Sequence, residues 1–307
     1  MMAVLLLLAA AGFFLVNAGL VNPNFMRVVY PFVAVGLLLP LLSREFYNRR
    51  DLAATLKRRR VLIIVAVGLA AVGLNSGYSF SPVGRRVPVL VYHRVGKAPH
   101  QDYPVPTISP AEFEREIAYL DAQGYRTITP DQLLDALEGR PAHLPRKPVL
   151  ITFDDGWRDN YLNAFPILKR HHMSGTVFLV ADGVNHTQRL SIPQIKEMSA
   201  AGWVFGAHTV SHPHLTELKA GSAQWEITQA KERLEEMLGT PVLYFCYPYG
   251  DGASNPSIRK IVAEAGYRAA FSTRFGLSGE QEDRLALKRV LISDTPWLAW
   301  LELRFVL

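Results

Sequence analysis

From residue 87 onward, short apolar runs alternate with amphipathic segments, and no other feature of the sequence constrains the fold as strongly. The runs have the length and composition of β-strands, whereas the segments between them have helical periodicity. Strands that alternate with helices form parallel sheets with helical crossovers, and about seven strands favour a (β/α)7-type barrel, related to the eight-fold one, over an open sheet. The expected strands are 87–92, 125–128, 149–153, 176–180, 203–207, 242–246 and 269–272.

Capping residues mark where the intervening helices begin. Ser109, Thr129 and Ser191 stand at the start of such segments with a proline at or near the first helical position, and Asn255 also precedes a proline. A short polar side chain before a proline is typical of a helix N-terminus. The expected helices are 109–123, 129–139, 160–171, a helix from 191, 223–238 and 256–265.

Three long apolar stretches precede this pattern, at about 2–21, 25–42 and 61–78. Each is near the length that a helix needs to cross a bilayer. The loop 43–60 carries seven Arg or Lys residues against two acidic ones, so the positive-inside rule places it in the cytoplasm. We therefore expect residues 1–80 to be a multi-pass anchor of transmembrane helices in the cytoplasmic (inner) membrane. The barrel, 87–307, should then face the periplasm or the cell exterior.

A cleaved signal peptide over about 1–18 is the alternative to the first span, but the segment lacks a basic n-region. The net charge of +6 is concentrated near the N-terminus, since residues 1–86 hold ten basic and two acidic residues. The remaining chain is close to neutral, which argues against a nucleic-acid partner. The single cysteine, Cys246, excludes an intramolecular disulfide and a zinc cluster of cysteines.

Chemically active side chains follow two of the expected strands. Asp154 and Asp155 end the run 149–153, and His208 and His212 follow 203–207 with a spacing of four residues. One carboxylate and two imidazoles form a three-ligand set with room for water, as in catalytic zinc sites, and the other carboxylate is left to act as a base. Taken singly, the Asp pair is often only a turn and the histidines only surface groups.

The segments 205–215 and 244–250 follow Thr152-Phe153-Asp154-Asp155-Gly156 in an order and spacing typical of a known family. Over about residues 87–293 the chain resembles the polysaccharide deacetylases, the NodB-homology domain of carbohydrate esterase family 4. The resemblance implies a distorted β/α barrel, a divalent-metal site and hydrolysis of N-acetyl or, less often, O-acetyl groups on sugars. By position, it makes Asp154 the general base and the backbone N–H of Tyr249 an oxyanion-hole donor. The implied metal ligands are Asp155, His208 and His212.

Two departures from the family pattern concern the third and the late motif. Cys246 stands where an arginine is usual, and the late motif around 289–294 has no histidine. In both losses the chain resembles the subgroup of poly-N-acetylglucosamine deacetylases of biofilm export. That subgroup has a Tyr-His pair after the first strand, which in this chain is Tyr92-His93. We therefore nominate His93 as the replacement acid and Arg289 as the group that orients Asp154. The competing interpretations are a structural histidine and an arginine in a surface ion pair.

The sequence thus predicts a membrane-anchored hydrolase that removes N-acetyl groups from an extracytoplasmic, poly-N-acetylglucosamine-like polysaccharide. The expected cofactor is Zn²⁺, with Ni²⁺ or Co²⁺ as alternatives. The expected partners are the polysaccharide, the membrane and an exopolysaccharide synthesis or export complex. Two alternatives stay open: a peptidoglycan or lipid-linked sugar deacetylase, and a non-catalytic glycan-binding barrel in an export complex.

Overall fold

The computed structural model describes residues 86–97, 105–140, 144–279 and 282–292. The chain divides into two units, Met1–Pro82 and Val83–Leu307, and all of the described residues belong to the second. The expected spans at 2–21, 25–42 and 61–78 and the basic loop 43–60 lie outside the described residues. Within the described ranges, none of the helices is long and apolar enough to cross a membrane.

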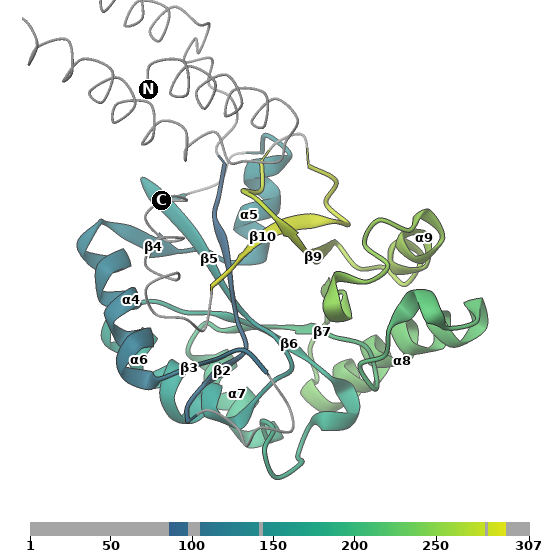
Figure 1. Cartoon of the computed structure of the whole chain (residues 1–307), viewed down its shortest axis with the longest axis horizontal. Helices are drawn as coiled ribbons and strands as arrows, with labels where there is room; N and C mark the ends of the chain where they lie inside the picture. Colours follow the sequence, from purple (N-terminus) through teal and green to yellow (C-terminus); the bar gives the residue numbers. More distant parts are fainter. Residues whose placement is uncertain (1–85, 98–104, 141–143, 280–281, 293–307) are drawn as a thin grey trace, which may run out of the picture. The chain divides into compact units, whose positions relative to one another are not determined.

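Seven parallel strands close into a barrel (Figure 1). The ring runs in the order β1, β10, β9, β8, β7, β6, β5, and pairing of β5 with β1 closes it. The predicted (β/α)7-type barrel is therefore confirmed. Its strands are β1 (Val89–Tyr92), β5 (Lys147–Phe153), β6 (Thr176–Leu179), β7 (Val204–Ala207), β8 (Tyr244–Cys246), β9 (Ala269–Phe275) and β10 (Leu287–Leu291).

The ring differs from the expected one by one strand. The predicted strand at 125–128 exists as β4 (Tyr125–Thr127), but it pairs only with the first residues of β5, and β1 takes over from Leu150. The seventh position belongs instead to β10, which the apolar pattern did not indicate because Lys288 and Arg289 interrupt it. A further pair, β2 (Arg94–Val95) and β3 (Thr107–Ile108), forms a small separate parallel sheet.

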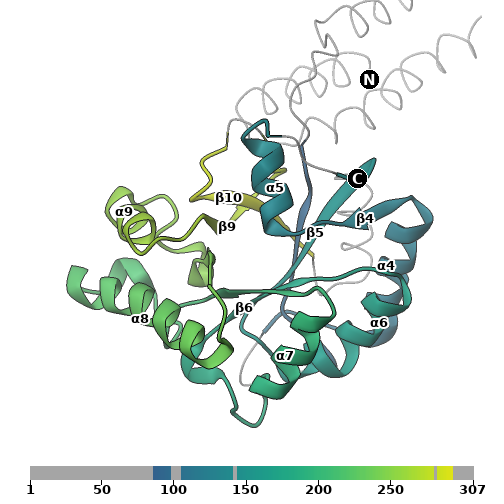
Figure 2. The ribbon, with the colours of Figure 1, turned by 180° about the vertical axis from the view of Figure 1, so that it is seen from behind.

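Helices surround the barrel, as Figures 1 and 2 show from opposite sides. The predicted caps of Ser109, Thr129 and Asn255 all accept hydrogen bonds from backbone N–H groups of the first helical turn. The helices are α4 (Pro110–Ala122), α5 (Pro130–Leu137), a π-helical turn η1 (Asn160–Ala164) leading into α6 (Phe165–Arg170), α7 (Ile192–Ala200), α8 (Ala220–Leu238) and α9 (Pro256–Glu264). Among the described residues there are also three short 3₁₀ turns, η2 (Ala181–Gly183), η3 (Leu215–Glu217) and η4 (Pro248–Gly250).

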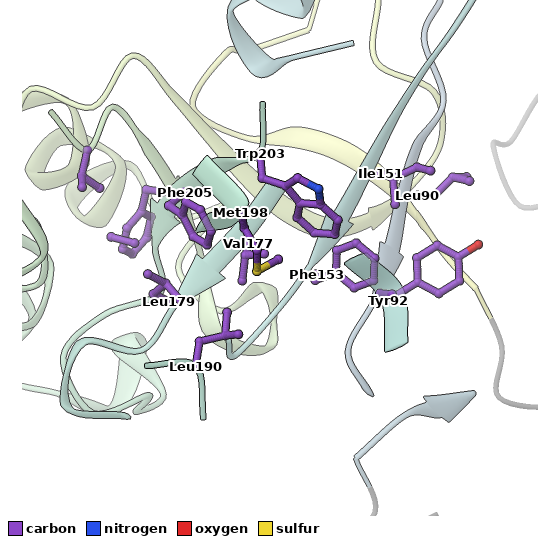
Figure 3. Packing of buried hydrophobic residues seen from close by; sticks show 14 of the residues in the cluster. Leu90, Tyr92, Ile151, Phe153, Val177, Leu179, Leu190, Met198, Trp203 and Phe205 are labelled. Atoms are coloured by element: carbon purple, nitrogen blue, oxygen red, sulfur yellow. The ribbon is translucent and has the colours of Figure 1, made fainter. Parts of the chain in front are cut away.

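The alternation of side chains along each strand divides the core into two layers. Outward-facing residues pack against the helices, and Figure 3 shows Phe153 between Tyr92 and Trp203, with ring centroids 5.7 and 5.4 Å away. Inward-facing residues form a second cluster together with leucines of α5, which therefore covers the N-terminal end of the barrel. The C-terminal end of the same interior carries polar side chains.

Candidate active site

Five strands place a chemically active side chain on their inward face, at or near the C-terminal end of the strand. On β5, for example, Leu150 belongs to the inner cluster, and the alternation then places Thr152 and Asp154 on the same face. These residues lie at the C-terminal mouth, where barrel enzymes place their active sites. They are His93 after β1, Asp154 after β5, His208 after β7, Cys246 at the end of β8 and Arg289 on β10.

The three predicted ligands meet at one point of this mouth. Nε2 of His212 lies 3.3 Å from Oδ1 of Asp155, and Nε2 of His208 lies 3.6 Å from the same oxygen. The two Nε2 atoms are 3.1 Å apart. Within the described part of the chain, these ligand atoms all lie within 4.8 Å of one another. The structure therefore brings together the donor set that the sequence predicted.

Four residues of the site have strained backbone conformations. Asp155, Thr209, His212 and Tyr249 have positive φ angles of 73°, 64°, 67° and 58°. Such conformations cost on the order of 1–3 kcal/mol each for a residue other than glycine, and they cluster at functional sites. At Asp155 the left-handed turn aims a second carboxylate into the same pocket as Asp154, although the two are adjacent in the chain.

Each of the three clustered side chains has an outer partner that fixes its orientation. Nδ1 of His208 donates to the carbonyl oxygen of Cys246 at 2.7 Å, which leaves Nε2 with its lone pair directed at the cluster. The indole N–H of Trp157 donates to Oδ2 of Asp155 at 2.9 Å, and the hydroxyl of Tyr249 lies 3.2 Å from Nδ1 of His212. Outer partners of this kind are characteristic of metal ligands.

The electrostatics of the cluster suit a cation. Burial lowers the pKa of His208 to about 4, so its imidazole is neutral near pH 7 and can act as a ligand. Burial alone would raise the pKa of Asp155, but a hydrogen bond from His212 and the nearby histidines hold it well below its usual range. One carboxylate and two imidazoles therefore fit a divalent ion of the zinc type.

Arg289 holds Asp154 in a bidentate ion pair. Its two terminal nitrogens each lie 2.8 Å from a carboxylate oxygen, and its Nε donates to the carbonyl of Ser272 at 2.8 Å. Both side chains are almost fully buried, which agrees with the expectation that Arg289 orients Asp154 and not with a surface pair. Burial raises the pKa of Asp154, but the charge and hydrogen bonds of Arg289 outweigh it and lower the pKa to about 2.

Cys246 packs beside this pair, with Sγ 3.0 Å from Nη2 of Arg289. Burial raises the pKa of the thiol well above its usual value, and the thiol is therefore protonated near neutral pH. A protonated thiol is a weak nucleophile, so we interpret Cys246 as a small packed residue and not as a nucleophile.

His93 lies at the end of β1 and faces the same mouth. Its side chain is one of the groups whose electrostatic interaction lowers the pKa of Asp154 and of Asp155. Asn160 of η1 donates to the backbone carbonyl of His93 at 2.8 Å, and the buried Nδ1 of the ring has no hydrogen-bond partner in the described ranges. Its role as the acid stays a prediction.

The contacts that fix the position of Trp157 were not predicted from the sequence. The guanidinium carbons of Arg189 and Arg94 lie 3.7 and 4.8 Å from the centroid of the indole, and Arg189 also donates to the backbone carbonyl of Asp155 at 2.6 Å. Only the position of Trp157, two residues after Asp155, was available as a signal. Tyr249, by contrast, is 58% exposed and stacks on His214 at 4.0 Å.

Comparison with known proteins places the chain in a group of related sequences. Residues 142–270 match the family model described as "Polysaccharide deacetylase". YxkH of Bacillus subtilis (strain 168), named for the same family, is 31% identical over 210 residues, which cover 68% of this chain and 72% of YxkH. The poly-beta-1,6-N-acetyl-D-glucosamine N-deacetylase of Staphylococcus aureus (strain MRSA252) is 25% identical over 230 residues, covering 67% and 78% of the two chains. The solved structure of IcaB from Ammonifex degensii is 31% identical with a TM-score of 0.62, covering 73% and 97%.

Proposed function

Since the chain belongs to the polysaccharide deacetylase family, enzymes that hydrolyse carbon–nitrogen bonds, we propose that it is a metal-dependent N-deacetylase of a poly-N-acetylglucosamine-like polysaccharide. The observation that carries the proposal is the convergence of Asp155, His208 and His212 beside the Asp154–Arg289 pair. The substrate class is supported by the Staphylococcus aureus relative, which is named for that polymer.

Asp155, His208 and His212 would hold the ion, with Zn²⁺ proposed and Ni²⁺ or Co²⁺ as alternatives. A divalent ion at this position would supply Lewis acidity toward the acetamide carbonyl and lower the pKa of water.

The chain's own residues then provide the proton transfers. Asp154, kept ionised by Arg289, would accept a proton from the water that attacks the carbonyl carbon. The backbone N–H of Tyr249 would donate to the developing oxyanion, and a donor of this kind is worth about 3 kcal/mol. His93 would protonate the amine nitrogen as the carbon–nitrogen bond breaks. The products are acetate and a glucosamine residue with a free amine.

We further propose that residues 1–80 anchor the enzyme in the cytoplasmic membrane, with the barrel facing the periplasm or exterior beside an exopolysaccharide synthesis or export complex. Three apolar stretches and the basic loop 43–60 support this placement.

Acetate release tests the reaction. The full-length protein should release acetate from poly-β-1,6-N-acetylglucosamine faster than from chitooligosaccharides or peptidoglycan, and Asp154→Asn should abolish release while keeping the metal. Faster release from peptidoglycan would favour the cell-wall alternative. Absence of release from any glycan, with glycan binding retained, would favour the non-catalytic barrel.

Metal analysis tests the ligand assignment. The wild type should hold one divalent ion per chain, whereas His208→Ala, His212→Ala and Asp155→Ala should lose it, because each removes one of three donors. Full metal content in both histidine variants would overturn the site. Equal metal loss in Asp154→Asn and Asp155→Ala would mean that the base and the ligand are assigned wrongly.

A further inference from the structure

A buried carboxylate outside the predicted site contacts the turn that carries both histidines. Glu226 lies on α8, is 7% exposed and shares the buried face of that helix with Ala223, Ile227 and Ala230. Glutamate is rarely buried without a partner, and in the described ranges Glu226 forms no ion pair. Its hydrogen bonds must therefore compensate for its desolvation.

Within the part of the chain that the structure describes, Glu226 accepts three hydrogen bonds, and all of them come from the turn between His208 and His212. Oε2 accepts from the backbone N–H of Val210 at 2.8 Å and from that of Ser211 at 3.0 Å. Oε1 accepts from the hydroxyl of Ser211 at 2.6 Å. Two successive backbone N–H groups that share one anionic oxygen form an anion-binding nest, here filled by a side chain of the same protein.

The residues on either side of this nest have strained backbones. Thr209 and His212 have φ angles of 64° and 67°, in the left-handed region that neither residue type favours. A strained conformation persists only where surrounding contacts overdetermine it. The hydroxyl of Thr209, which accepts from the N–H of His212 at 2.9 Å, is one such contact, and Glu226 fixes the two residues in between.

We propose that Glu226 is a positioning residue for the metal site. By binding the N–H groups of Val210 and Ser211, it holds the turn in the one conformation in which His208 and His212 both face Asp155. It contacts neither substrate nor ion and acts only through the turn. The inference rests on the proposed metal-dependent function.

Zn²⁺ affinity of the full-length protein, measured by competition with a chromophoric chelator, tests the inference without any substrate. Glu226→Ala should retain its fold by circular dichroism and bind Zn²⁺ about 10- to 100-fold more weakly, the usual cost of losing an outer partner. Glu226→Gln keeps the reach and an acceptor oxygen for both N–H groups, so it should bind Zn²⁺ almost as well as the wild type. Glu226→Asp keeps the charge but loses the reach, and its affinity should fall.

Glu116 provides the matched control, since it is also a buried glutamate on a helix, 1% exposed, and accepts from the hydroxyl of Tyr92 at 2.8 Å. Glu116→Ala should lower the melting temperature but leave Zn²⁺ affinity unchanged. Equal affinity losses in the two alanine variants, or wild-type affinity in Glu226→Ala, would overturn the inference.

If Glu226→Ala does not fold, the comparison of Glu226→Asp with Glu226→Gln tests the inference. Wild-type Zn²⁺ affinity in the aspartate variant, together with weakened Zn²⁺ affinity in the glutamine variant, would overturn it. Its failure also differs from failure of the proposed function. Zn²⁺ binding by the wild type without acetate release would refute the reaction and leave the role of Glu226 standing.

Discussion

Asp154 is a buried carboxylate that the protein keeps ionised. Burial raises its pKa, but Arg289 lowers it to about 2, compared with about 3.9 for an unperturbed aspartate. A depressed pKa in the folded state contributes stability that is fully present above about pH 4 and is lost as the pH falls through the folded pKa. The same ion pair thus supports both the fold and the availability of Asp154 as a base.

Arg289→Met should separate these two effects. Without the guanidinium, the largest effect that lowers the pKa of Asp154 is removed, so this pKa rises and the acidic limb of the pH profile of kcat/KM moves to higher pH. The uncompensated charge should also cost about 3–5 kcal/mol of unfolding free energy. Arg233→Met, which breaks the exposed pair with Asp182, should cost less than about 1 kcal/mol and leave the pH profile unchanged. An unmoved acidic limb in Arg289→Met would contradict the role of Arg289.

His93 should donate the proton that releases the amine. Histidine is the side chain best suited to donate near neutral pH, and the late motif offers no alternative histidine. His93→Ala should keep its fold and metal content but lower kcat by about 10²- to 10⁴-fold and flatten the alkaline limb of the pH profile. His186→Ala, at an exposed histidine, is the control and should behave like the wild type. A kcat for His93→Ala within a few-fold of the wild type would contradict the assignment of His93 as the acid.

At the scale of the elements, Gly206 allows β7 to pack closely against its neighbours. A Cβ at this position would lie 2.7 Å from the ring of Phe178 and 2.8 Å from the carbonyl oxygen of Tyr244. Gly206→Ala should therefore cost about 1–3 kcal/mol in chemical denaturation, the usual range for overpacking. Gly221→Ala on α8, where a Cβ meets nothing within 4 Å, should be neutral or stabilise by up to about 1 kcal/mol. Equal stability of the two variants would show that the barrel wall adapts at Gly206.

The strands also show what the hydrophobic pattern of the sequence can and cannot predict. Periodicity predicted six of the seven barrel strands, because buried parallel strands read as apolar runs. It missed β10, whose inward position Arg289 is charged because it pairs with Asp154 across the barrel. A contact between residues so far apart in the chain leaves no local signal.

The residues of the candidate site also include some that the sequence predicted and some that it did not. The motifs predicted the clustered side chains, since Asp155, His208 and His212 lie in the loops that follow the C-terminal ends of β5 and β7. Their outer partners were not predictable, because each is fixed by tertiary packing. Glu226 reads from the sequence as one more charged residue of an amphipathic helix, and only the fold shows it facing inward.

At the scale of the whole molecule, charge is divided unevenly between the two units. The loop 43–60 holds seven basic residues, whereas the chain after residue 86 is slightly acidic. Short basic loops stay in the cytoplasm, and a single span after such a loop carries the downstream domain to the opposite side of the membrane. The barrel would then meet a polymer outside the cytoplasm.

A C-terminal fusion tests this topology. We expect a reporter that is active only outside the cytoplasm to be on, and one that is active only in the cytoplasm to be off. Changing Arg58, Arg59 and Arg60 to glutamate should weaken the preference, because orientation follows the Lys and Arg bias of the loops. The same three changes at Arg115, Arg158 and Arg274 of the barrel should leave it unaltered, since folded domains are translocated largely regardless of charge. A cytoplasmic signal from the unmodified fusion would show that the predicted orientation is wrong. The barrel would then lie on the side of the membrane where an exported polysaccharide is absent.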